Sequence, residues 1–375
     1  MVQQFLEHSK KILTSERSNF KWGSKGSGLI SLFGYQNEYD LREGYPLATT
    51  KKMFTKSMIH ETLWFIRGNT NIKYLEDNGC KIWRGNAFEY NLPAMVKESI
   101  FPRNLLEKSV KYSSDWDKSM LEYAQKIKES SEFAERFGDA GPIYPAQWRH
   151  WKHFDEKQGK IVEIDQLRNM IEGLKKKPTG KKHIVTAWNP GDVPNMSLPP
   201  CHVLFQATIN EENELELNLY QRSSDMFLGV QFNYASYSLI TQLIAQEVGA
   251  IPKTFIHSFG DTHFYTGLEN KSNWYKEHFH EFRERVRKVK SREGYLEILD
   301  WVNKNAPRDA NQTEENYEPS KDYDHITAIL EQLSREPRPL PKLIIAKKPF
   351  DKLNIDDFII EDYNPYPKIE RAMAI

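Results

Sequence analysis

The stretch from residue 183 to residue 265 sets short strand-like segments around one apolar helix, and this pattern limits the fold more than any other feature of the chain. The segments HIVTAWNP, HVLFQATI and ELELNLYQR are β-rich, and the polar residues 210–213 between the last two are typical of a hairpin turn. Residues 234–249 form an apolar helix that ends at Gly249, after which TFIHSFGDTHFY returns to strand. We therefore expect an α/β (α+β) fold with a mixed or mostly antiparallel β-sheet flanked by helices.

The rest of the chain adds further helices and strands to this centre. Residues 2–14 and 55–67 carry apolar residues at helical spacing, and three glycines between 23 and 28 predict a loop before the strand LISLFGYQNEYDL. DHITAILEQLSR predicts a helix that stops at the prolines of EPRPLP, and PKLIIAK and DDFIIEDY predict two final strands. With no internal repeat, we predict a single domain over residues 1–375.

Two charged segments interrupt this pattern. Residues 89–139 are rich in Lys, Glu, Ser and Tyr with few aliphatic residues, and residues 267–324 mix both signs of charge. We interpret both as mainly helical insertions. The role of the second stays open, and a solvated helical hairpin is the plainest interpretation of its mixed charge.

Composition excludes several classes of protein. The chain has 52 basic and 52 acidic residues, so its formal net charge is zero and it lacks the cationic excess of a general polyanion binder. Its only cysteines, Cys80 and Cys201, exclude a disulfide scaffold and a cysteine-rich metal site, and fit a reducing compartment. No apolar run reaches about 18 residues and the N-terminal stretch mixes charges with amides, so we expect a cytoplasmic protein without a membrane helix or signal peptide.

Cys201 is the first candidate for chemistry. It follows two prolines and precedes a strand-like segment in MSLPPCHVLFQ. A lone cysteine is most often a small buried hydrophobe, and a catalytic nucleophile is the alternative. The neighbouring His202 adds little, because adjacent strand residues point to opposite faces.

The segment QRSSDMFLGVQFNYASY (221–237) is the second candidate. Arg222 suits a phosphate or carboxylate, since its planar fork gives two parallel hydrogen bonds. The amide of Asn233 can pair with a ring edge that presents a donor and an acceptor, as uracil does. A capped helix start with a surface arginine is the plain alternative.

Three other polar residues lie in apolar surroundings. His263 and Tyr265 are two apart in GDTHFYT, hence on one face of a strand, where they bind a ligand or simply pack. Glu61 lies among apolar residues of a predicted helix, and such a carboxylate is either paired or functional. The aromatic and polar string GPIYPAQWRHW (141–151) indicates no function by composition alone.

Taken together, these segments resemble the thymidylate synthases and their hydroxymethylase relatives. The resemblance covers about 260 residues in the order of the family, and it implies that family's fold. The matching strings are SLFGYQNEYDLREGYPLATTKK, MIHETLWFIRGNTNIKYLEDNGCKIW, GPIYPAQWRHW, TAWNPGDVPNMSLPPCHVLFQ, LYQRSSDMFLGVQFNYASY, FIHSFGDTHFY, LSREPRPLPKLII and IEDYNPYPKI.

The resemblance implies a covalent mechanism. Cys201 adds to C6 of the pyrimidine of dUMP, which makes C5 a carbon nucleophile toward 5,10-methylenetetrahydrofolate. Arg222 helps to hold the thiol as thiolate, and Glu61 organises proton transfer through water. Tyr144 lies near the C5 proton, and Asn233 reads the uracil edge, where cytosine-specific relatives have Asp. Asp225 completes this catalytic set and hydrogen-bonds the pterin.

The resemblance also implies two sets of binding residues, a folate cosubstrate without a metal, and a homodimer that needs neither membrane nor nucleic acid. His263 and Tyr265 bind the sugar 3′-hydroxyl, and the C-terminal tail that ends Ala374-Ile375 closes over the site. The nucleotide set is Lys25, Lys181, Lys182, His202, Gln221, Arg222, Ser223, Asn233, His263 and Tyr265. The folate set is Lys51, Ile82, Trp83, Asn86, Leu198, Asp225, Phe232 and Ala374.

The phosphate site departs from the family. The synthases have an arginine in the N-terminal glycine loop, where this chain has Ser24 beside Lys25. Two adjacent arginines that reach across the dimer are here Lys181 and Lys182. Only Arg222 is kept of the usual four, and lysine gives charge without a bidentate fork.

The folate wall departs as well. Asn86 replaces a second tryptophan, Arg84 and Gly85 replace acids, Pro145 replaces a glycine, and Phe54 replaces another folate-facing residue. A 5-methylene intermediate on the nucleotide reacts with hydride from tetrahydrofolate to give thymidylate, or with water to give the 5-hydroxymethyl nucleotide. A polar Asn86 offers space and an anchor for water.

These departures leave three hypotheses. The first is a deoxyuridylate hydroxymethylase, of the kind that viruses with modified thymine use in a host cytoplasm. The second is a thymidylate synthase with a divergent phosphate site. The third is an inactive relative that only binds nucleotide, folate or RNA, although Cys201, Glu61 and Asn233 are all in place.

Overall fold

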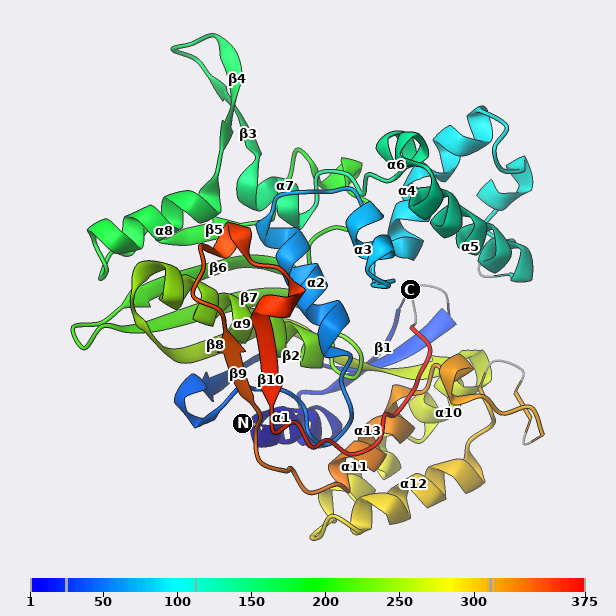
Figure 1. The fold of residues 1–375 in the computed structure, drawn as a ribbon. Helices are drawn as coiled ribbons and strands as arrows, with labels where there is room; N and C mark the ends of the chain where they lie inside the picture. Colours follow the sequence, from blue (N-terminus) through cyan, green and yellow to red (C-terminus); the bar gives the residue numbers. More distant parts are fainter. Residues whose placement is uncertain (1, 24–25, 112, 310–311, 314, 374–375) are drawn as a thin grey trace. The chain divides into compact units, whose positions relative to one another are not determined.

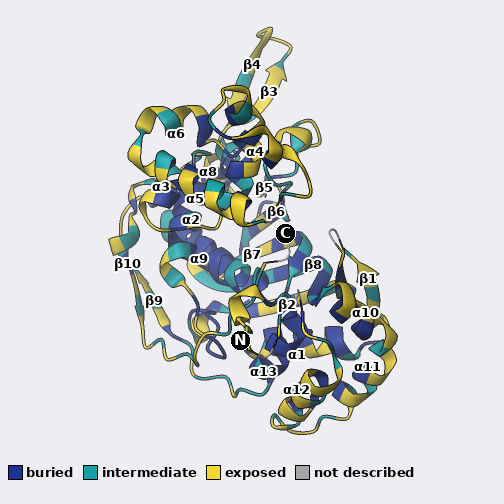
Figure 2. Cartoon of the chain, turned by 90° about the vertical axis from the view of Figure 1, so that its right-hand side faces the viewer, coloured by how far each residue is buried: buried dark blue, intermediate teal, exposed yellow. Residues whose placement is uncertain are grey.

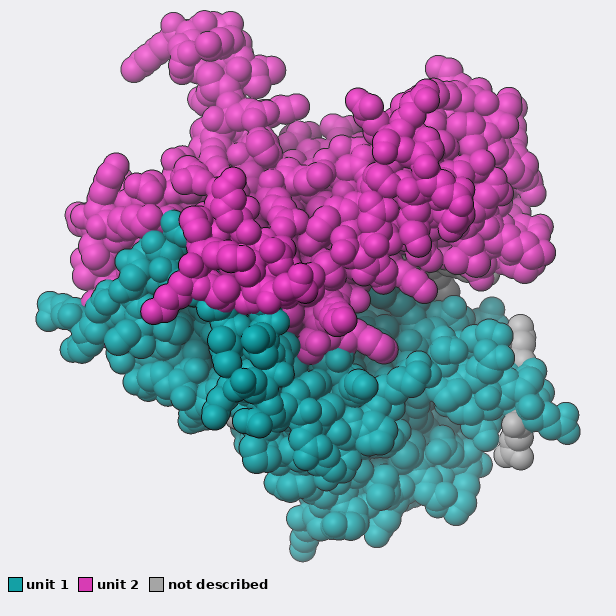
Figure 3. All heavy atoms as spheres, viewed as in Figure 1, with its two compact units in different colours: residues 1–53, 211–345, 358–375 teal, residues 54–210, 346–357 magenta. Residues whose placement is uncertain are grey.

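The computed structural model describes residues 2–23, 26–111, 113–309, 312–313 and 315–373, and its chain divides into two compact units. Unit 1 consists of Met1–Met53, Glu211–Ile345 and Phe358–Ile375, and unit 2 consists of Phe54–Asn210 and Ala346–Asp357 (Figures 1 and 3). The prediction of a single domain is not tested by this division.

The strands β1, β2, β7 and β8 of unit 1 belong to a mixed sheet, as the sequence predicts. β2 (Ser27–Asp40) pairs antiparallel with β1 (Asn19–Trp22) on one side and with β8 (Ile251–Leu268) on the other. β7 (Glu214–Asp225) runs parallel to β8, so that Asp225 lies in register with His263.

The helix α9 (Val230–Val248) is the buried centre of unit 1 and is dark blue along most of its length in Figure 2. It begins four residues earlier than predicted and ends where Gly249 takes a left-handed conformation with φ 74°, a common way to terminate a helix. α1 (Val2–Thr14) and α13 (His325–Leu333) also bury apolar faces in this unit, and Asp324 caps α13 by accepting from the N–H groups of Ile326 and Thr327.

The second predicted insertion is mainly helical. It contains α10 (Glu269–Glu277), α11 (Phe279–Arg287) and α12 (Gly294–Asn305). The two predicted C-terminal strands are also present, since β9 (Lys342–Ile345) pairs antiparallel with β10 (Phe358–Glu361).

Unit 2 carries the other helices and two short antiparallel pairs. β5 (Ile184–Thr186) pairs with β6 (His202–Ile209), and β3 (Trp151–Asp155) pairs with β4 (Lys160–Ile164). The helices of this unit are α2 (Thr55–Ile66), α3 (Lys73–Asp77), α4 (Arg84–Lys97), α5 (Ser114–Glu129), α6 (Ser131–Phe137), α7 (Tyr144–Arg149) and α8 (Gln166–Lys176). The first predicted insertion is therefore helical, but its first helix begins at Arg84, directly after a string that matches the family.

Two local predictions were wrong in part. The glycine loop was expected to precede one strand, yet Asn19–Trp22 forms β1 and Gly28 lies inside β2. β1 is almost wholly exposed, so it lacks the apolar alternation that identifies a strand in sequence. Residues 221–225 belong to β7 and α9 begins at Val230, so the segment 221–237 does contain a helix start, but Arg222 lies on a strand and no side-chain hydrogen bond caps the helix.

The turn predicted at 210–213 falls between β6, which ends at Ile209, and β7, which begins at Glu214. Asn213 has a φ of 60°, which asparagine tolerates better than most residues. Among the residues that the structure describes, no helix is both long enough and apolar enough to span a membrane.

Gly260 is a position where the sheet of unit 1 tolerates no side chain. A Cβ there would lie 2.8 Å from the carbonyl oxygen of Arg222 and 3.2 Å from its Cα. We expect G260A to displace β7 and to lower the free energy of unfolding by about 1–3 kcal/mol in urea titrations. The control is G191A, whose Cβ would meet no heavy atom closer than Oδ1 of Asn189 at 3.5 Å. Equal midpoints for the two variants would contradict this account.

Candidate functional site

The backbone at Cys201 is held by the hydroxyl of Tyr144. The oxygen of that hydroxyl accepts the N–H of Cys201 at 2.7 Å and the N–H of His202 at 3.3 Å. Cys201 lies just before β6, is partly buried, and carries a thiol rather than a disulfide. Because both N–H groups point at one oxygen, the phenol proton of Tyr144 is left to act as a donor.

Tyr144 is itself fixed by aromatic packing. It begins α7, where Pro145 takes an early position that costs no hydrogen bond, so this departure from the family suits a helix start. Its ring centroid lies 5.0 Å from that of Phe65 and 5.9 Å from that of Trp83. Burial, with a smaller contribution from the nearby Cys201, raises the pKa of Tyr144 well above its usual range.

Glu61 and Trp83 of unit 2 are hydrogen-bonded to each other. The indole N–H of Trp83 donates to Oε1 of Glu61 at 2.7 Å. Burial raises the pKa of Glu61 to about 7, and the hydrogen bond from Trp83 opposes part of that increase. A carboxyl group with a pKa near 7 can both give and take a proton at neutral pH.

The start of α4 carries the altered wall residues. Arg84 donates two hydrogen bonds to the buried Glu76, from Nε to Oε1 at 2.8 Å and from Nη2 to Oε2 at 2.6 Å. Asn86 is partly exposed in the first turn of α4, three residues after Trp83, which is the N-cap of this helix. Arg84 therefore has a structural role, and the polar Asn86 lies close to Trp83 in the sequence at the start of α4.

The remaining predicted residues of unit 2 lie nearer its surface. Lys181 and Lys182 are exposed just before β5. Ile82 is 38% exposed, Leu198 is partly buried, and Phe54 is exposed at the N-terminus of α2. The roles expected for these residues rest on the resemblance.

Asn233 is oriented by Gln221 in unit 1. Nε2 of the buried Gln221 donates to Oδ1 of Asn233 at 3.0 Å, while its Oε1 accepts from Nε2 of His257 at 2.8 Å. This directs the NH₂ group of Asn233 away from Gln221. The amide of Asn233 is thus presented in one orientation, which a donor–acceptor ring edge requires.

Asp225 lies at the end of β7, where its Oδ1 accepts the N–H groups of Phe227 at 3.0 Å and Leu228 at 3.1 Å. The same oxygen is 3.4 Å from Nδ1 of His325. Burial alone would raise the pKa of Asp225, but His325, His263 and the backbone N–H groups outweigh it and lower the pKa.

His325 is a residue to which the sequence did not point. It is fully buried at the first position of α13, and its ring packs edge-on against Tyr265 at 5.3 Å. The only signal in the sequence was its place directly after a helix-capping Asp.

His263 and Tyr265 lie on one face of β8, as predicted, with their rings 5.4 Å apart. Nδ1 of His263 is 2.9 Å from Oδ1 of Asp261, whose other oxygen accepts from Lys21 at 2.5 Å. Arg222 and Ser223 are partly buried on β7, and Phe232 is partly buried on α9.

Lys51 is buried, unlike most lysines. Its Nζ donates to the carbonyl oxygen of Phe227 at 2.6 Å and lies 3.7 Å from the centre of that ring. Burial lowers the pKa of Lys51 to about 7, although Asp225 opposes the decrease. Lys51 and Asp225 thus belong to one electrostatic group. Ser24, Lys25, Ala374 and Ile375 lie outside the described residues.

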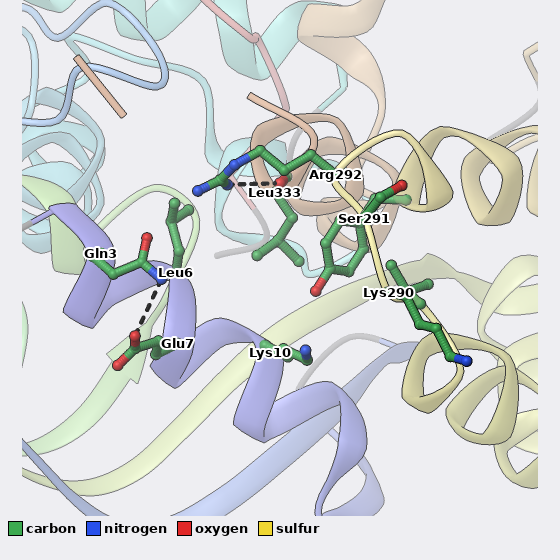
Figure 4. Close-up of a pocket in the computed structure, with 10 residues that line it drawn as sticks. Gln3, Leu6, Glu7, Lys10, Lys290, Ser291, Arg292 and Leu333 are labelled. Carbon is green, nitrogen blue, oxygen red and sulfur yellow. Dashed lines mark hydrogen bonds between the residues drawn. The ribbon is translucent and has the colours of Figure 1, made fainter. Parts of the chain in front are cut away.

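The pocket drawn in Figure 4 is a separate feature of unit 1. It has a volume of about 420 Å³ and is lined by α1, the segment 289–292, Tyr295 and Leu333. Two of its side chains, Gln3 and Glu7, are paired at 3.1 Å, and it contains none of the predicted site residues. In the part of the chain that the structure describes, no group of three or more His, Cys, Asp or Glu residues could hold a metal ion.

Comparisons with known proteins give one family. The family model described as thymidylate synthase matches residues 3–375. A thymidylate synthase of Listeria monocytogenes serotype 4a is 35% identical over 383 residues and covers all of both chains. The thymidylate synthase of Malacoplasma penetrans is 37% identical over 348 residues, with 92% of this chain and 91% of that protein covered, and that of Mesoplasma florum is 35% identical over the full length of both.

The raised pKa of Glu61 has a consequence for stability. Between pH 4.5 and about 7 the folded protein keeps a proton on Glu61 that the unfolded chain has lost, so this contribution is full at low pH and is lost as pH rises through about 7. The E61Q variant lacks this titration. We expect its free energy of unfolding, relative to the original chain, to rise by about 2 kcal/mol between pH 5 and pH 8. Urea titrations at both pH values measure this, with the exposed E132Q as control, and parallel curves for E61Q and the original chain would show that the pKa is not raised.

Proposed function

Because the chain belongs to the thymidylate synthase family, we propose that it transfers a one-carbon unit from 5,10-methylenetetrahydrofolate to C5 of dUMP. The observation that carries this proposal is the set of contacts around Cys201, Tyr144, Glu61 and Trp83. It places a thiol, a hydroxyl donor and a carboxyl group with a pKa near 7 on rigid elements of unit 2.

Three residues would carry the chemistry. The sulfur of Cys201 forms a bond to C6, and the electron pair of the C5–C6 double bond becomes available at C5 for attack on the methylene carbon. Glu61 exchanges protons through water with the pyrimidine and the pterin, a task that suits a pKa of about 7. Tyr144 keeps its proton, because its pKa is raised well above the usual range, and would position a water molecule that takes the C5 proton, and its hold on the N–H of Cys201 keeps the nucleophile in place.

The residues of unit 1 would select the substrates. The oriented amide of Asn233 pairs with O4 and N3–H of uracil, and Gln221 sets that orientation. Arg222 and Ser223 bind the phosphate, and His263 and Tyr265 bind the 3′-hydroxyl of the sugar. The ionised Asp225 accepts a hydrogen bond from the pterin, which its lowered pKa favours.

The product depends on what attacks the 5-methylene intermediate. We propose that water does so and that the products are 5-hydroxymethyl-dUMP and tetrahydrofolate. This proposal is supported by Asn86, a polar side chain in the first turn of α4, three residues after its N-cap Trp83, with Arg84 engaged by Glu76. A difference of about 1.4 kcal/mol between the two barriers changes the product ratio tenfold, so one polar residue is enough to decide it.

A thymidylate synthase is the second candidate. It is favoured by the relatives from Listeria, Malacoplasma and Mesoplasma, which carry that name at 35–37% identity over nearly the full chain. In that case hydride from tetrahydrofolate reduces the intermediate, and dihydrofolate is released with thymidylate.

We also propose that the functional unit is a homodimer in which Lys181 and Lys182 serve the phosphate site of the partner subunit. Both lysines are exposed directly before β5. Two adjacent exposed cations make a positive patch, which is suited to binding the phosphate of a nucleotide in a partner subunit.

One incubation tests the product. Purified protein is given dUMP and methylenetetrahydrofolate, and both nucleotide and folate products are identified by mass. We expect 5-hydroxymethyl-dUMP with tetrahydrofolate, and we expect N86W to shift the ratio toward thymidylate by about tenfold or more.

Two variants control this experiment. K97W places the same side chain at an exposed position of α4 and is expected to leave the product ratio unchanged. C201S is expected to lose activity by roughly a thousandfold or more, because it removes the nucleophile. Thymidylate as the sole product of the original chain would refute the role of Asn86, and full activity of C201S would refute the covalent mechanism.

The dimer proposal is tested by complementation. The double variant K181A/K182A is expected to raise the KM for dUMP about tenfold with little change in kcat, as loss of phosphate binding does. The control K176A, at an exposed lysine, is expected to leave both KM and kcat unchanged. Refolding this double variant together with C201S should restore a low KM, since one site of the mixed dimer then has both Cys201 and intact lysines. No restoration, or an active monomer by sedimentation, would contradict the proposal.

A further inference from the structure

The C-terminal tail, residues 362–373, is attached to unit 1 by hydrogen bonds along its length. The N–H of Tyr366 donates to the carbonyl of Thr49 at 2.8 Å, and Arg335 donates to the carbonyl of Pro367 at 2.9 Å. Near its end, the N–H of Ala372 donates to the carbonyl of Asp322 at 2.8 Å. In Figure 1 this segment is the red trace that runs past α13.

Arg371 is a largely buried side chain close to the end of the tail. Its Nε donates to the carbonyl of Asp324 at 2.9 Å and its Nη2 donates to Oγ1 of Thr327 at 3.0 Å. Its Nε is also 3.7 Å from Oδ2 of Asp322, and the side chains of Arg371 and Asp322 are only 8% and 4% exposed. A buried guanidinium needs such partners, because an unpaired charge is costly to bury.

Two of the partners of Arg371, Asp322 and Asp324, are held by contacts within the second insertion. The hydroxyl of Tyr317 donates to Asp322 at 2.8 Å. Lys271 and the hydroxyl of Tyr275 each lie 3.0 Å from Oδ2 of Asp324. A single segment, residues 267–324, contains Lys271, Tyr275, Tyr317, Asp322 and Asp324. This segment therefore forms a charged binding site for Arg371, which we call the seat.

Asp309 holds the two ends of the second insertion together. Its two carboxyl oxygens accept the N–H of Leu268 at 2.7 Å and the N–H of Tyr323 at 2.8 Å, so it ties the start of the insertion to its end. Burial raises the pKa of Asp309 to about 6. The geometry of the seat therefore depends on the insertion as a folded whole.

His325 connects the seat with Asp225, the residue that is predicted to hydrogen-bond the pterin. Nε2 of His325 lies 3.0 Å from the carbonyl oxygen of Ala372, and Nδ1 of the same ring lies 3.4 Å from Oδ1 of Asp225. His325 thus contacts the tail with one nitrogen and the carboxylate with the other. A displaced tail would release this ring and alter the surroundings of Asp225.

We propose that the second insertion is the docking site of the chain's own C-terminal tail, and that Arg371, Asp322 and His325 are positioning residues that hold the tail and Asp225 in register before folate binds. The effect on folate rests on the function proposed above, whereas the docking itself does not.

The docking is tested without substrate. Hydrogen–deuterium exchange of residues 366–373 is compared among the original chain, R371A, T327V and the control K368A, whose exposed lysine pairs with Glu370 on the tail itself. We expect exchange at Ala372 to be at least about tenfold faster in R371A, slightly faster in T327V, and unchanged in K368A. Melting temperatures confirm that each variant is folded, and T327V, which removes one acceptor at similar volume, serves if R371A does not fold.

The positioning role is tested by kinetics. We expect R371A to raise the KM for methylenetetrahydrofolate about tenfold with the KM for dUMP unchanged, and R371K to recover part of that loss because it keeps the charge without the fork. Unchanged exchange in R371A overturns the docking. Faster exchange with unchanged folate kinetics overturns the positioning role. Absence of any turnover by the original chain would refute the proposed function alone, since the exchange result would still stand.

Discussion

The parallel pairing of β7 with β8 is the constraint on which unit 1 depends. It places Gln221 in register with Phe259 and Asp225 in register with His263. Residues about 40 positions apart in the chain are thereby brought to one end of the sheet, where α9 adds Asn233. Gly260 makes this approach possible, because any side chain there would meet the backbone of Arg222.

Burial of charge is the second organising feature, and each unit uses it differently. In unit 2, burial raises the pKa of Glu61 to about 7 while Trp83 supplies one hydrogen bond, so the carboxyl group is poised for proton exchange. In unit 1, burial lowers the pKa of Lys51 to about 7, and its neighbour Asp225 stays ionised through His325 and backbone N–H groups. A buried ionisable group with few partners titrates near neutral pH, whereas a well-paired one does not.

Two residues that depart from the family, and the second insertion, have structural explanations within their own units. Arg84 pairs with the buried Glu76, and Pro145 suits the first turn of α7. The second insertion, which the sequence left without a role, places Asp322 and the carbonyl oxygen of Asp324 beside Arg371 of the tail. The pairing of Arg84 and the contacts of Arg371 join residues that the sequence separates, so they could not be inferred from composition or spacing, whereas the place of Pro145 reflects a local preference at a helix start.

The sequence by itself determined the class of fold, most helices and strands, the family, and the candidate residues Cys201, Glu61, Asn233 and His263. These follow from local periodicity, from glycine and proline positions, and from motifs that occupy contiguous stretches. Tertiary structure decided the exposed strand β1, the place of residues 221–225 in a strand, the Tyr144 hydroxyl as an acceptor for Cys201, and the contacts of His325 and Arg371. Local patterns cannot reveal these features because they depend on which distant groups share a buried space, and the free energy of a buried polar group is set by its partners.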